Sequence, residues 1–338
     1  MNSNYTKLFT IGVPAYNAER YLPECLESLT EQTLSDFKIV IIDDGSTDRT
    51  GEICDRFCHA HDNAIVVHKT NQGVALARRD IIQRADSSYV IFLDADDCLS
   101  PNTIAHCSII AKQFNYPDII TFDYSVMSDF SSPIRSNSLD YGLHEICDLD
   151  AIRKALCAGE FNNLCMKAIR INLLSDSIAK DQRLIYSEDL HQMIFAIEHV
   201  RSLYCLGKPL YFYRQNLQSN TKNYNPQYLK DLKTTLSTLL EKAKQWGLEE
   251  YAEKGSLLQA CYLASIAVSD ENLPKPSKES CLVSIGATIK ELGISRSAMR
   301  ALRPDLRAVV SSMTNGNGIM AKVILQVHLI ARKLLHRI

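Results

Sequence analysis

Three aspartates, Asp94, Asp96 and Asp97, follow directly after the apolar run YVIFL. The run predicts a buried strand that ends in the sequence DADD. Ionised carboxylates at such a place are costly unless something cationic neutralises them. Side chains two residues apart on an extended backbone point to the same side, which would bring the carboxylates of Asp94 and Asp96 together. Mg²⁺ and Mn²⁺ prefer oxygen ligands and commonly bridge carboxylates to phosphate oxygens. The pattern therefore predicts Mn²⁺ or Mg²⁺ on Asp96 and Asp94, next to a diphosphate.

The elements that must position these carboxylates alternate between strand and helix patterns. Strands are expected at 8–13 (ended by Pro14), 37–42, 64–68, 88–93 and 118–123, and helices at 18–32, 49–61 (capped by Thr47 or Asp48), 74–85 and 101–114. This order predicts an α/β fold with a mainly parallel sheet flanked by helices. Ligands bind at the carboxyl ends of such strands, so residues 15–17, 43–46 and 94–97 are expected to converge.

The pattern loosens after residue 125. Helices are expected at 148–159 and 188–199, a strand at 203–213, and a helical region from about 226, interrupted by a loop at 272–277. No run of 18 residues stays apolar, so no membrane span is predicted.

Several classes of protein are excluded by composition and by missing motifs. The net charge of −2 argues against a bulk nucleic-acid binder. No G-x-G-x-x-G follows the first strand and no Gly-Lys-Ser/Thr completes a P-loop, which disfavours a dehydrogenase and a P-loop enzyme. The first residues do not read as a signal peptide, so a cytoplasmic protein with reduced thiols is expected from its eleven scattered cysteines.

The segment CDRFCHAH leaves two interpretations open. Cys54 and Cys58, one helical turn apart, could bind zinc together with His59 and His61. The alternative is an amphipathic helix whose Cys54 and Cys58 face the core with Ile53 and Phe57, and no second ligand pair at zinc spacing lies nearby.

Four motifs in order carry a specific resemblance. VPAYNAERYLPECLESLTEQTLSDFKIVIIDDGSTDRT, NQGVALARR and YVIFLDADD are similar to the family 2 glycosyltransferases of the GT-A fold, over residues 8–125. The resemblance continues more weakly to about residue 222, through NNLCMKAIR, SEDLH and LYFYRQNLQSNT. It implies a GT-A catalytic domain over residues 1–222, with a nucleotide-sugar-binding half (1–125) and an acceptor half (126–222). Residues 223–338 would then form a helical C-terminal region.

The same resemblance assigns roles to individual residues. The nucleotide base would be lined by Pro14, Ala15, Tyr16 and Asn17, Asp44 would accept a hydrogen bond from uracil, and Arg78 would lie near the nucleotide. The ribose or sugar would be faced by Asp94 and Ala95, and Asp96 would be the main metal ligand. Asp97 would support the loop or the donor sugar, and Arg214 would contact phosphate or acceptor. Glu188 and Asp189 match the acidic pair in front of the acceptor, with Asp189 as catalytic base. Some relatives supply a further metal ligand, a histidine, near the last segment, but residues 215–220 contain none.

Each assignment has a structural alternative. Tyr16 could pack at the strand end, Arg78 could be an exposed helix arginine, and Glu188–Asp189 could stabilise a helix N-terminus. Asp43 is expected to order its turn through backbone amides.

The implied reaction is inverting, metal-dependent transfer of a sugar from a UDP-sugar to a hydroxyl of a glycan or lipid-linked oligosaccharide, in capsule, exopolysaccharide or O-antigen synthesis. A non-catalytic sugar-nucleotide-binding protein is one alternative. A sugar nucleotidyltransferase is another, although the glycine-rich loop that it needs after the first strand is replaced by Val13–Asn17.

The C-terminal segment is basic. Residues 290–338 carry nine Lys/Arg against two acids. On a helical wheel of residues 318–338, one face is polar and basic and carries Lys322, Gln326, Arg332, Lys333, His336 and Arg337. The other face is apolar and carries Val323, Val327, Ile330, Leu334 and Ile338. Leu325 and Leu329 break the pattern. Such a helix can lie on the inner face of an anionic membrane or pack on the catalytic domain. The oligomeric state is left open.

Overall fold

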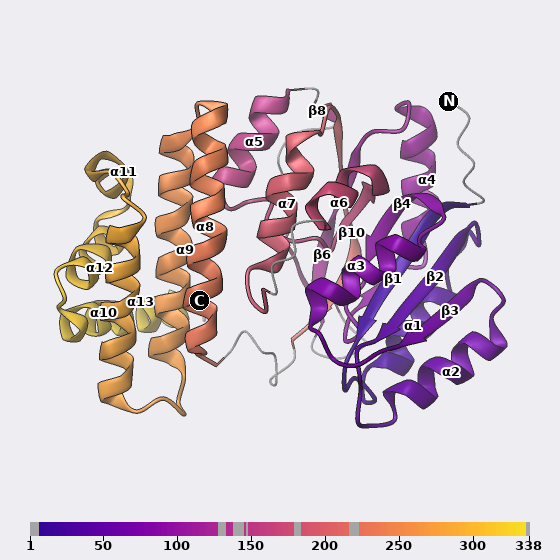
Figure 1. The fold of residues 1–338 in the computed structure, drawn as a ribbon, viewed down its shortest axis with the longest axis horizontal. Coiled ribbons are helices and arrows are strands. Elements are labelled where there is room, and N and C mark those ends of the chain that lie inside the picture. The colour runs from indigo at the N-terminus through magenta and orange to yellow at the C-terminus, as the bar shows by residue number, and fades with distance from the viewer. Residues whose placement is uncertain are drawn as a thin grey trace. The chain divides into compact units, whose positions relative to one another are not determined.

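A computed structural model describes residues 7–127, 133–137, 145–146, 148–178, 184–215 and 223–335 (Figure 1). The chain divides into two compact units. Unit 1 comprises residues 1–152, 163–185 and 195–216, and unit 2 comprises residues 153–162, 186–194 and 217–338. Helices α5 (Leu149–Ala158) and α7 (Glu188–Glu198) contribute residues to both units.

Unit 1 is built on a mixed, mainly parallel sheet of the GT-A type. Its strands are β1 (Lys7–Ala15), β2 (Phe37–Asp43), β3 (Ala64–His68), β4 (Ser87–Phe92), β5 (Cys98–Leu99), β6 (Ile119–Met127), β7 (Pro133–Asn137), β8 (Glu145–Ile146), β9 (Lys167–Arg170) and β10 (Leu203–Arg214). Its helices are α1 (Leu22–Thr30), α2 (Thr50–Ala60), α3 (Val74–Arg84), α4 (Thr103–Gln113) and α6 (Ile171–Ile178). The strand order among the described residues is β3-β2-β1-β4-β9-β6-β10-β5, with β7 beside β6 and β8 beside β10.

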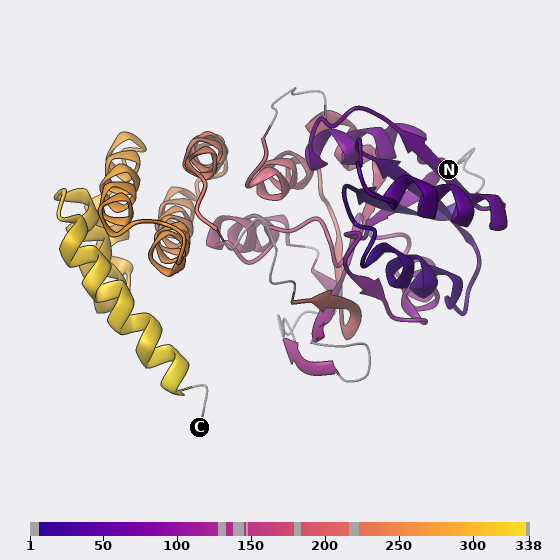
Figure 2. The same ribbon diagram turned by 90° about the horizontal axis from the view of Figure 1, so that it is seen from below.

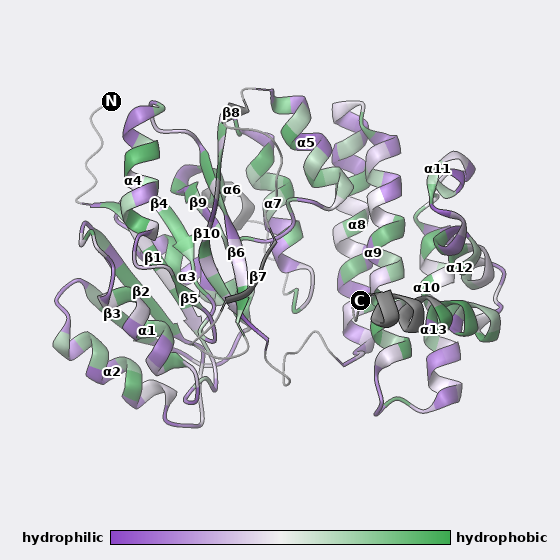
Figure 3. Ribbon diagram, turned by 180° about the vertical axis from the view of Figure 1, so that it is seen from behind, coloured by the Kyte–Doolittle hydropathy of each residue, from purple (hydrophilic) through white to green (hydrophobic). Residues whose placement is uncertain are grey.

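The centre of the sheet is apolar because its strands are covered on both faces. Phe9, Ile11, Ile41, Ile91 and Phe92 have essentially no exposed surface. Figure 3 shows β1, β2 and β4 largely in the colours of hydrophobic residues. Helices α3 and α6 contact each other and the strands, and α3 lies in front of the sheet in Figure 1.

The sequence patterns did not indicate strand β9, which lies between β4 and β6 and is antiparallel to both. Ala168 and Ile169 of β9 are fully buried. The four residues Lys167–Arg170 are too few for their periodicity to indicate a strand.

Pro14 does not end β1, contrary to the prediction. Strand β1 continues to Ala15, with Pro14 opposite Ile42 of β2. On the other side, the pairing of β1 with β4 stops at Gly12. Gly12 accepts from Leu93 on that side, and the backbone of Pro14 points the same way because residues two apart share a direction. The nitrogen of Pro14 therefore faces a place where no ladder bond is needed.

Helix α1 begins at Leu22 rather than at residue 18. Pro23 lies in its first turn, where proline is favoured. The amides of Ala18 and Glu19 donate instead to Thr50 Oγ1 and Asp48 Oδ2, at 2.7 and 3.1 Å. The N-cap of α2 is Arg49, which makes no side-chain cap, so the prediction of Thr47 or Asp48 as the cap is wrong; Asp48, one residue earlier, accepts from the Thr50 amide at 2.9 Å.

Unit 2 is helical, as the sequence predicts from residue 226. Its helices are α8 (Pro226–Trp246), α9 (Glu249–Ser269), α10 (Lys275–Glu291), α11 (Arg296–Ala301), α12 (Pro304–Thr314) and α13 (Gly318–Leu335). Asn225 caps α8, and Gly247 ends it in the left-handed conformation. The expected loop at 272–277 is shorter, because Pro276 lies in the first turn of α10. Among the described residues, no helix is both long and apolar enough to cross a membrane.

Close helix contacts in unit 2 depend on glycine. Helix α13, yellow in Figure 2, and α12 both pack on α10. A Cβ at Gly286 of α10 would lie 2.1 Å from the Met313 carbonyl oxygen of α12. Backbone cannot move aside as a side chain can, so a methyl group at residue 286 must separate the two helices.

We expect Gly286→Ala to lower the free energy of unfolding by about 1–3 kcal/mol, because overpacking outweighs the gain in helix propensity. Urea denaturation measures the change. Ser284→Ala, at an exposed position of the same helix, is the control and should be neutral or slightly stabilising. Equal stability of both variants would contradict the close packing of α10 on α12.

Candidate active site

The carboxyl ends of β1 and β2 are joined by hydrogen bonds between their loops. The Asp44 amide donates to the Ala15 carbonyl at 2.9 Å. Asn17 has φ 48°, a left-handed conformation that asparagine tolerates. Its amide donates to Ser46 Oγ at 3.0 Å, and its Oδ1 accepts from the Thr47 amide at 2.8 Å. Asn17, predicted to line the base, thus also fixes the two loops together.

Asp43 orders the turn after β2, as the sequence predicts. Its Oδ1 accepts from the Ser46 amide at 3.1 Å, and its Oδ2 lies 2.8 Å from His68 Nδ1 at the end of β3. Burial alone would raise the pKa of Asp43, but the hydrogen bonds with Ser46 and His68 lower it. Hydrogen bonds with Asp43 and then Asp55 raise the pKa of His68.

Asp44 is buried, and both of its carboxylate oxygens already accept backbone amides. The donors are Gln72 at 3.0 and 3.2 Å and Gly73 at 2.8 Å, just before α3. A carboxylate has about four lone-pair sites, and these amides use three of them, which leaves one for the predicted bond to a base. The turn is tight here: a Cβ at Gly45, φ +77°, would lie 2.6 Å from the Asn71 nitrogen.

Arg78 is buried, so the alternative of an exposed helix arginine is wrong. Its side chain is 4% exposed, and Nη2 lies 3.3 Å from Asp94 Oδ1. The guanidinium also lies over the Phe92 ring, 5.8 Å from its centroid. The Cys165 thiol donates to the other oxygen of Asp94 at 3.4 Å. Arg78 therefore supplies the cation that part of the DADD sequence requires.

Asp97 is fully buried and contacts β10. Tyr211 donates its hydroxyl to Asp97 Oδ2 at 2.6 Å, and the Arg214 amide donates to Oδ1 at 2.8 Å. Burial raises the pKa of Asp97 well above its ordinary value, and the charges of Asp94 and Asp96 raise it further. Arg214 Nε donates to the Asp96 carbonyl at 2.9 Å, and its guanidinium pairs with Glu24. The support role predicted for Asp97 has its partners here.

Sequence reasoning did not find Tyr211, Glu24 or Cys165. Tyr211 and Arg214 lie more than a hundred positions after the aspartates that they bind. No motif spacing marks such a partner, because the contact depends on strand register alone.

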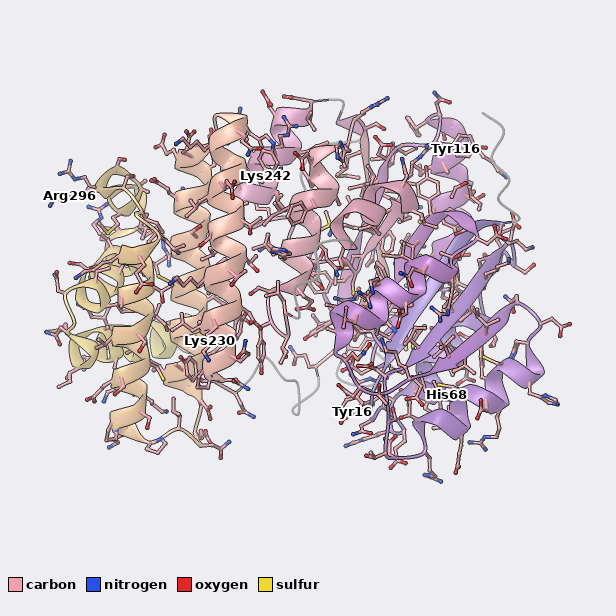
Figure 4. All side chains as sticks on the ribbon, viewed as in Figure 1. Tyr16, His68, Tyr116, Lys230, Lys242 and Arg296 are labelled. Atoms are coloured by element: carbon pink, nitrogen blue, oxygen red, sulfur yellow. The ribbon has the colours of Figure 1, made fainter. Side chains whose placement is uncertain are left out.

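The remaining predicted residues lie at the same edge of unit 1. Tyr16 is 51% exposed, so it is not packed into the core, and Figure 4 shows it at the edge where the labelled His68 also lies. Pro14, Asp94 and Asp96 are half-buried, whereas Ala15 and Ala95 are buried. The edge thus combines an exposed aromatic ring with accessible carboxylates and the buried cation Arg78. Residues 216–222, the last part of the family-like segment, lie outside the described residues.

The carboxylate oxygens of Asp94 and Asp96 are ligands that suit a hard divalent cation. Both are half-buried oxygen donors at one turn, and a cation such as Mg²⁺ often takes one or two carboxylates and completes its shell with phosphate and water. In the described ranges, no group of three or more His, Cys, Asp and Glu side chains is arranged to hold a metal. A metal at this edge would therefore need further oxygen ligands, such as those of a bound phosphate group.

The segment around Cys54 fits the helix interpretation. Cys54 is fully buried in α2, and burial, followed by the charge of Asp43, raises the pKa of its thiol to about 12. His61 stacks on Phe57. All cysteines in the described ranges are free thiols.

Glu188 and Asp189 belong to unit 2, in the first turn of α7. The segment before them is anchored on α8: the Tyr186 amide donates to Asp231 at 3.0 Å, and the Tyr186 ring stacks on Tyr228 at 4.7 Å. Burial raises the pKa of Tyr228, and nearby Tyr262 and Glu188 raise it further. The acids thus occupy the helix N-terminus that the structural alternative describes, which is compatible with a catalytic role.

The matches to known proteins support a glycosyltransferase. Residues 10–121 match the family model described as glycosyl transferase family 2. A Bacillus subtilis protein named uncharacterized glycosyltransferase EpsJ is 28% identical over 80% of this chain and 81% of its own.

Two solved structures are similar in fold. S. aureus TarS (residues 1–349, in complex with UDP-GlcNAc) superposes with a TM-score of 0.72 and 17% identity, covering 96% of this chain and 92% of that one. The mannosyltransferase PcManGT of Pyrobaculum calidifontis, in complex with GDP-Man and Mn²⁺, has a TM-score of 0.52 and 16% identity, covering 95% and 87%.

The His68–Asp43 pair makes stability depend on pH. The pKa of His68 is raised on folding. Its contribution to the free energy of unfolding is therefore fully present below the pKa of the unfolded chain, about 6.5, and is lost as the pH rises through the pKa of the folded protein. The pKa of Asp43 is lowered on folding. Its contribution to the free energy of unfolding is therefore fully present above the pKa of the unfolded chain, about 3.9, and is lost as the pH falls through the pKa of the folded protein.

We therefore expect His68→Gln to cost more stability at pH 5.5 than at pH 8.5, measured by urea denaturation. The His68 side chain is 46% exposed, so solvent screening limits the difference to about 0.2–1 kcal/mol. An equal loss at both pH values would mean that the imidazolium does not stabilise the turn after β2.

Proposed function

We propose that this protein transfers a sugar from a UDP-sugar to an acceptor hydroxyl, with inversion at the anomeric carbon and with the help of a divalent cation. One observation carries the proposal: hydrogen bonds join the loops at the carboxyl ends of β1, β2 and β4. One edge of the sheet therefore carries Tyr16, Asp44, Arg78, Asp94 and Asp96. UDP is favoured by the TarS complex and by the family resemblance, and Mn²⁺ by the PcManGT complex.

The donor would be bound by residues of different chemistry along this edge. The exposed ring of Tyr16 offers an aromatic face to uracil, and Asp44 offers a carboxylate to its imide. Asp94 and Asp96 would hold the cation, which would supply positive charge to the leaving diphosphate. Arg214, anchored by Glu24 and the Asp96 carbonyl, would add a fixed positive charge on the side of β10.

The acceptor would be activated by a carboxylate of α7. In this proposal Asp189 takes the proton from the acceptor hydroxyl, a role worth about 10²–10⁴-fold in rate, and Glu188 lies beside it. A single displacement with one base accounts for inversion.

A non-catalytic sugar-nucleotide-binding protein is the alternative. The accessible carboxylates of Asp94 and Asp96 argue against it, because paired oxygen ligands at a strand end suit the cation that stabilises a leaving diphosphate. A nucleotidyltransferase would need a glycine-rich loop where β1 reads Val13-Pro14-Ala15.

Asp96→Ala should reduce metal-dependent release of UDP from its sugar nucleotide by about 100-fold or more, because a main cation ligand is lost. A panel of sugar nucleotides is incubated with Mn²⁺, with Mg²⁺ and with chelator, and UDP is measured. Asp62→Ala, which removes an exposed carboxylate from unit 1, is the control.

If both variants behave alike, Asp96 is not a cation ligand. If the wild-type protein binds a donor in calorimetry but never releases UDP, even with acceptors present, the binding-protein alternative is preferred.

We also propose that α13 contacts the inner face of the membrane, where a lipid-linked acceptor of surface-glycan synthesis would lie. The division into two faces that the helical wheel predicts is only partly correct for α13. Ala321 and Leu325 are buried and Lys322 pairs with Glu279, whereas Ile319, Val323 and Val327 are 62%, 47% and 63% exposed. An apolar stripe in a strongly basic segment supports binding to anionic lipid. The side chains of residues 328–338 lie outside the described part of the chain.

Val323→Glu/Val327→Glu should abolish flotation with phosphatidylglycerol-containing vesicles at low ionic strength. The matched control is Val283→Glu/Ala287→Glu, which places two exposed acids at the same spacing on α10. Equal flotation of the two double variants would place the lipid contact elsewhere, and no flotation of the wild-type protein would remove the membrane proposal.

A further inference from the structure

The turn that carries Asp94 and Asp96 is closed by one backbone hydrogen bond. The Asp97 amide donates to the Asp94 carbonyl at 3.0 Å, which makes Asp94 and Asp97 the ends of a four-residue turn and Ala95 and Asp96 its centre. A single bond of this kind does not fix how the turn is oriented on the sheet. Contacts from outside the turn must therefore decide where the two carboxylates point.

Tyr211 of β10 supplies such a contact to both ends of the turn. Its hydroxyl donates to Asp97 Oδ2 at 2.6 Å and accepts from the Asp94 amide at 3.3 Å. The amide can only donate, so the single hydrogen of the phenol is directed at Asp97. Tyr211 itself is held opposite Leu99 in the antiparallel pairing of β10 with β5.

Burial separates the role of Tyr211 from that of Arg214. Arg214 binds the same turn, through its amide to Asp97 and its Nε to the Asp96 carbonyl, but its side chain keeps some exposure and a charge that can face a diphosphate. Tyr211 has no exposed surface. It can therefore influence the reaction only through the position of the turn.

We propose that Tyr211 is a positioning residue that sets the separation and direction of Asp94 and Asp96 for a divalent cation. The proposal rests on the proposed function, because it assumes that these carboxylates bind Mn²⁺ or Mg²⁺ together with the donor diphosphate. Small cations require near-ideal ligand geometry, and hydrogen bonds that orient metal ligands affect metal affinity by about 10–100-fold. Without the hydroxyl, the Asp94 amide and Asp97 Oδ2 each lose a partner and the turn can shift.

Tyr211→Phe tests this with a readout other than turnover. Mn²⁺ is titrated into the protein with saturating UDP, and free Mn²⁺ is followed by its electron paramagnetic resonance signal. We expect the Kd of Mn²⁺ to rise about 10–100-fold in Tyr211→Phe. Tyr204→Phe is the matched control: it removes a hydroxyl from a buried tyrosine of the same strand, packed on Phe114, and should leave the Kd within about twofold.

Asp97→Asn provides a second variant in case Tyr211→Phe does not fold. Its amide group nearly preserves the shape of the carboxylate but cannot accept the same pair of hydrogen bonds. The Kd should rise here too. The double variant should be no weaker than the weaker single variant, because both changes remove one shared bond.

Three outcomes decide the matter. A raised Kd in Tyr211→Phe and Asp97→Asn, but not in Tyr204→Phe, supports the positioning role. A wild-type-like Kd in the two site variants overturns it and leaves the proposed function intact. Failure of the wild-type protein to bind Mn²⁺ with UDP overturns both this inference and the metal-dependent function.

Discussion

Holding several carboxylates at the end of a buried strand is the constraint on which unit 1 depends. The carboxylates of Asp94 and Asp97 in the DADD turn are compensated differently. Asp94 pairs with the buried Arg78, Asp97 accepts hydrogen bonds from Tyr211 and Arg214, and Asp96 lies between them with its carbonyl bonded to Arg214. Asp94 is balanced by a full opposite charge, whereas Asp97 accepts a hydroxyl and a backbone amide from β10.

The position of β10 follows from the inserted strand β9. Because β9 separates β4 from β6, the parallel pair β6–β10 forms a second block of the sheet beside the parallel block β3-β2-β1-β4. The end of β10 then pairs with β5, directly after the turn, and brings Tyr211 and Arg214 to the aspartates. Strand β10, in the half of the sequence that the family resemblance assigns to the acceptor, thus helps to shape the turn that carries Asp94 and Asp96.

Local and long-range polarity play different parts at this edge. The turns after β1 and β2 are satisfied by Asn17, Asp43 and Asp44, whose side chains bond backbone amides close to them in space. These contacts order the loops before any ligand binds, which lowers the entropy that binding must overcome. The exposed ring of Tyr16 lies on this ordered frame, so a base would meet a largely prearranged surface.

Much of this protein was predictable from sequence because the signals are local. Periodicity located most strands and helices of residues 8–123 within a few positions, the Asp43 turn followed from residue chemistry, and the order of four motifs indicated the GT-A fold and family. Residue type alone could not distinguish an exposed Arg78 from the buried partner of Asp94.

Only the tertiary structure decided the placement of β9, the continuation of β1 through Pro14, and the contacts of Tyr211 and Glu24 with the turn and with Arg214. These depend on strand order and register, which join residues far apart in the chain. A sequence pattern reports the face on which a side chain lies, but it does not report which distant strand supplies the neighbour.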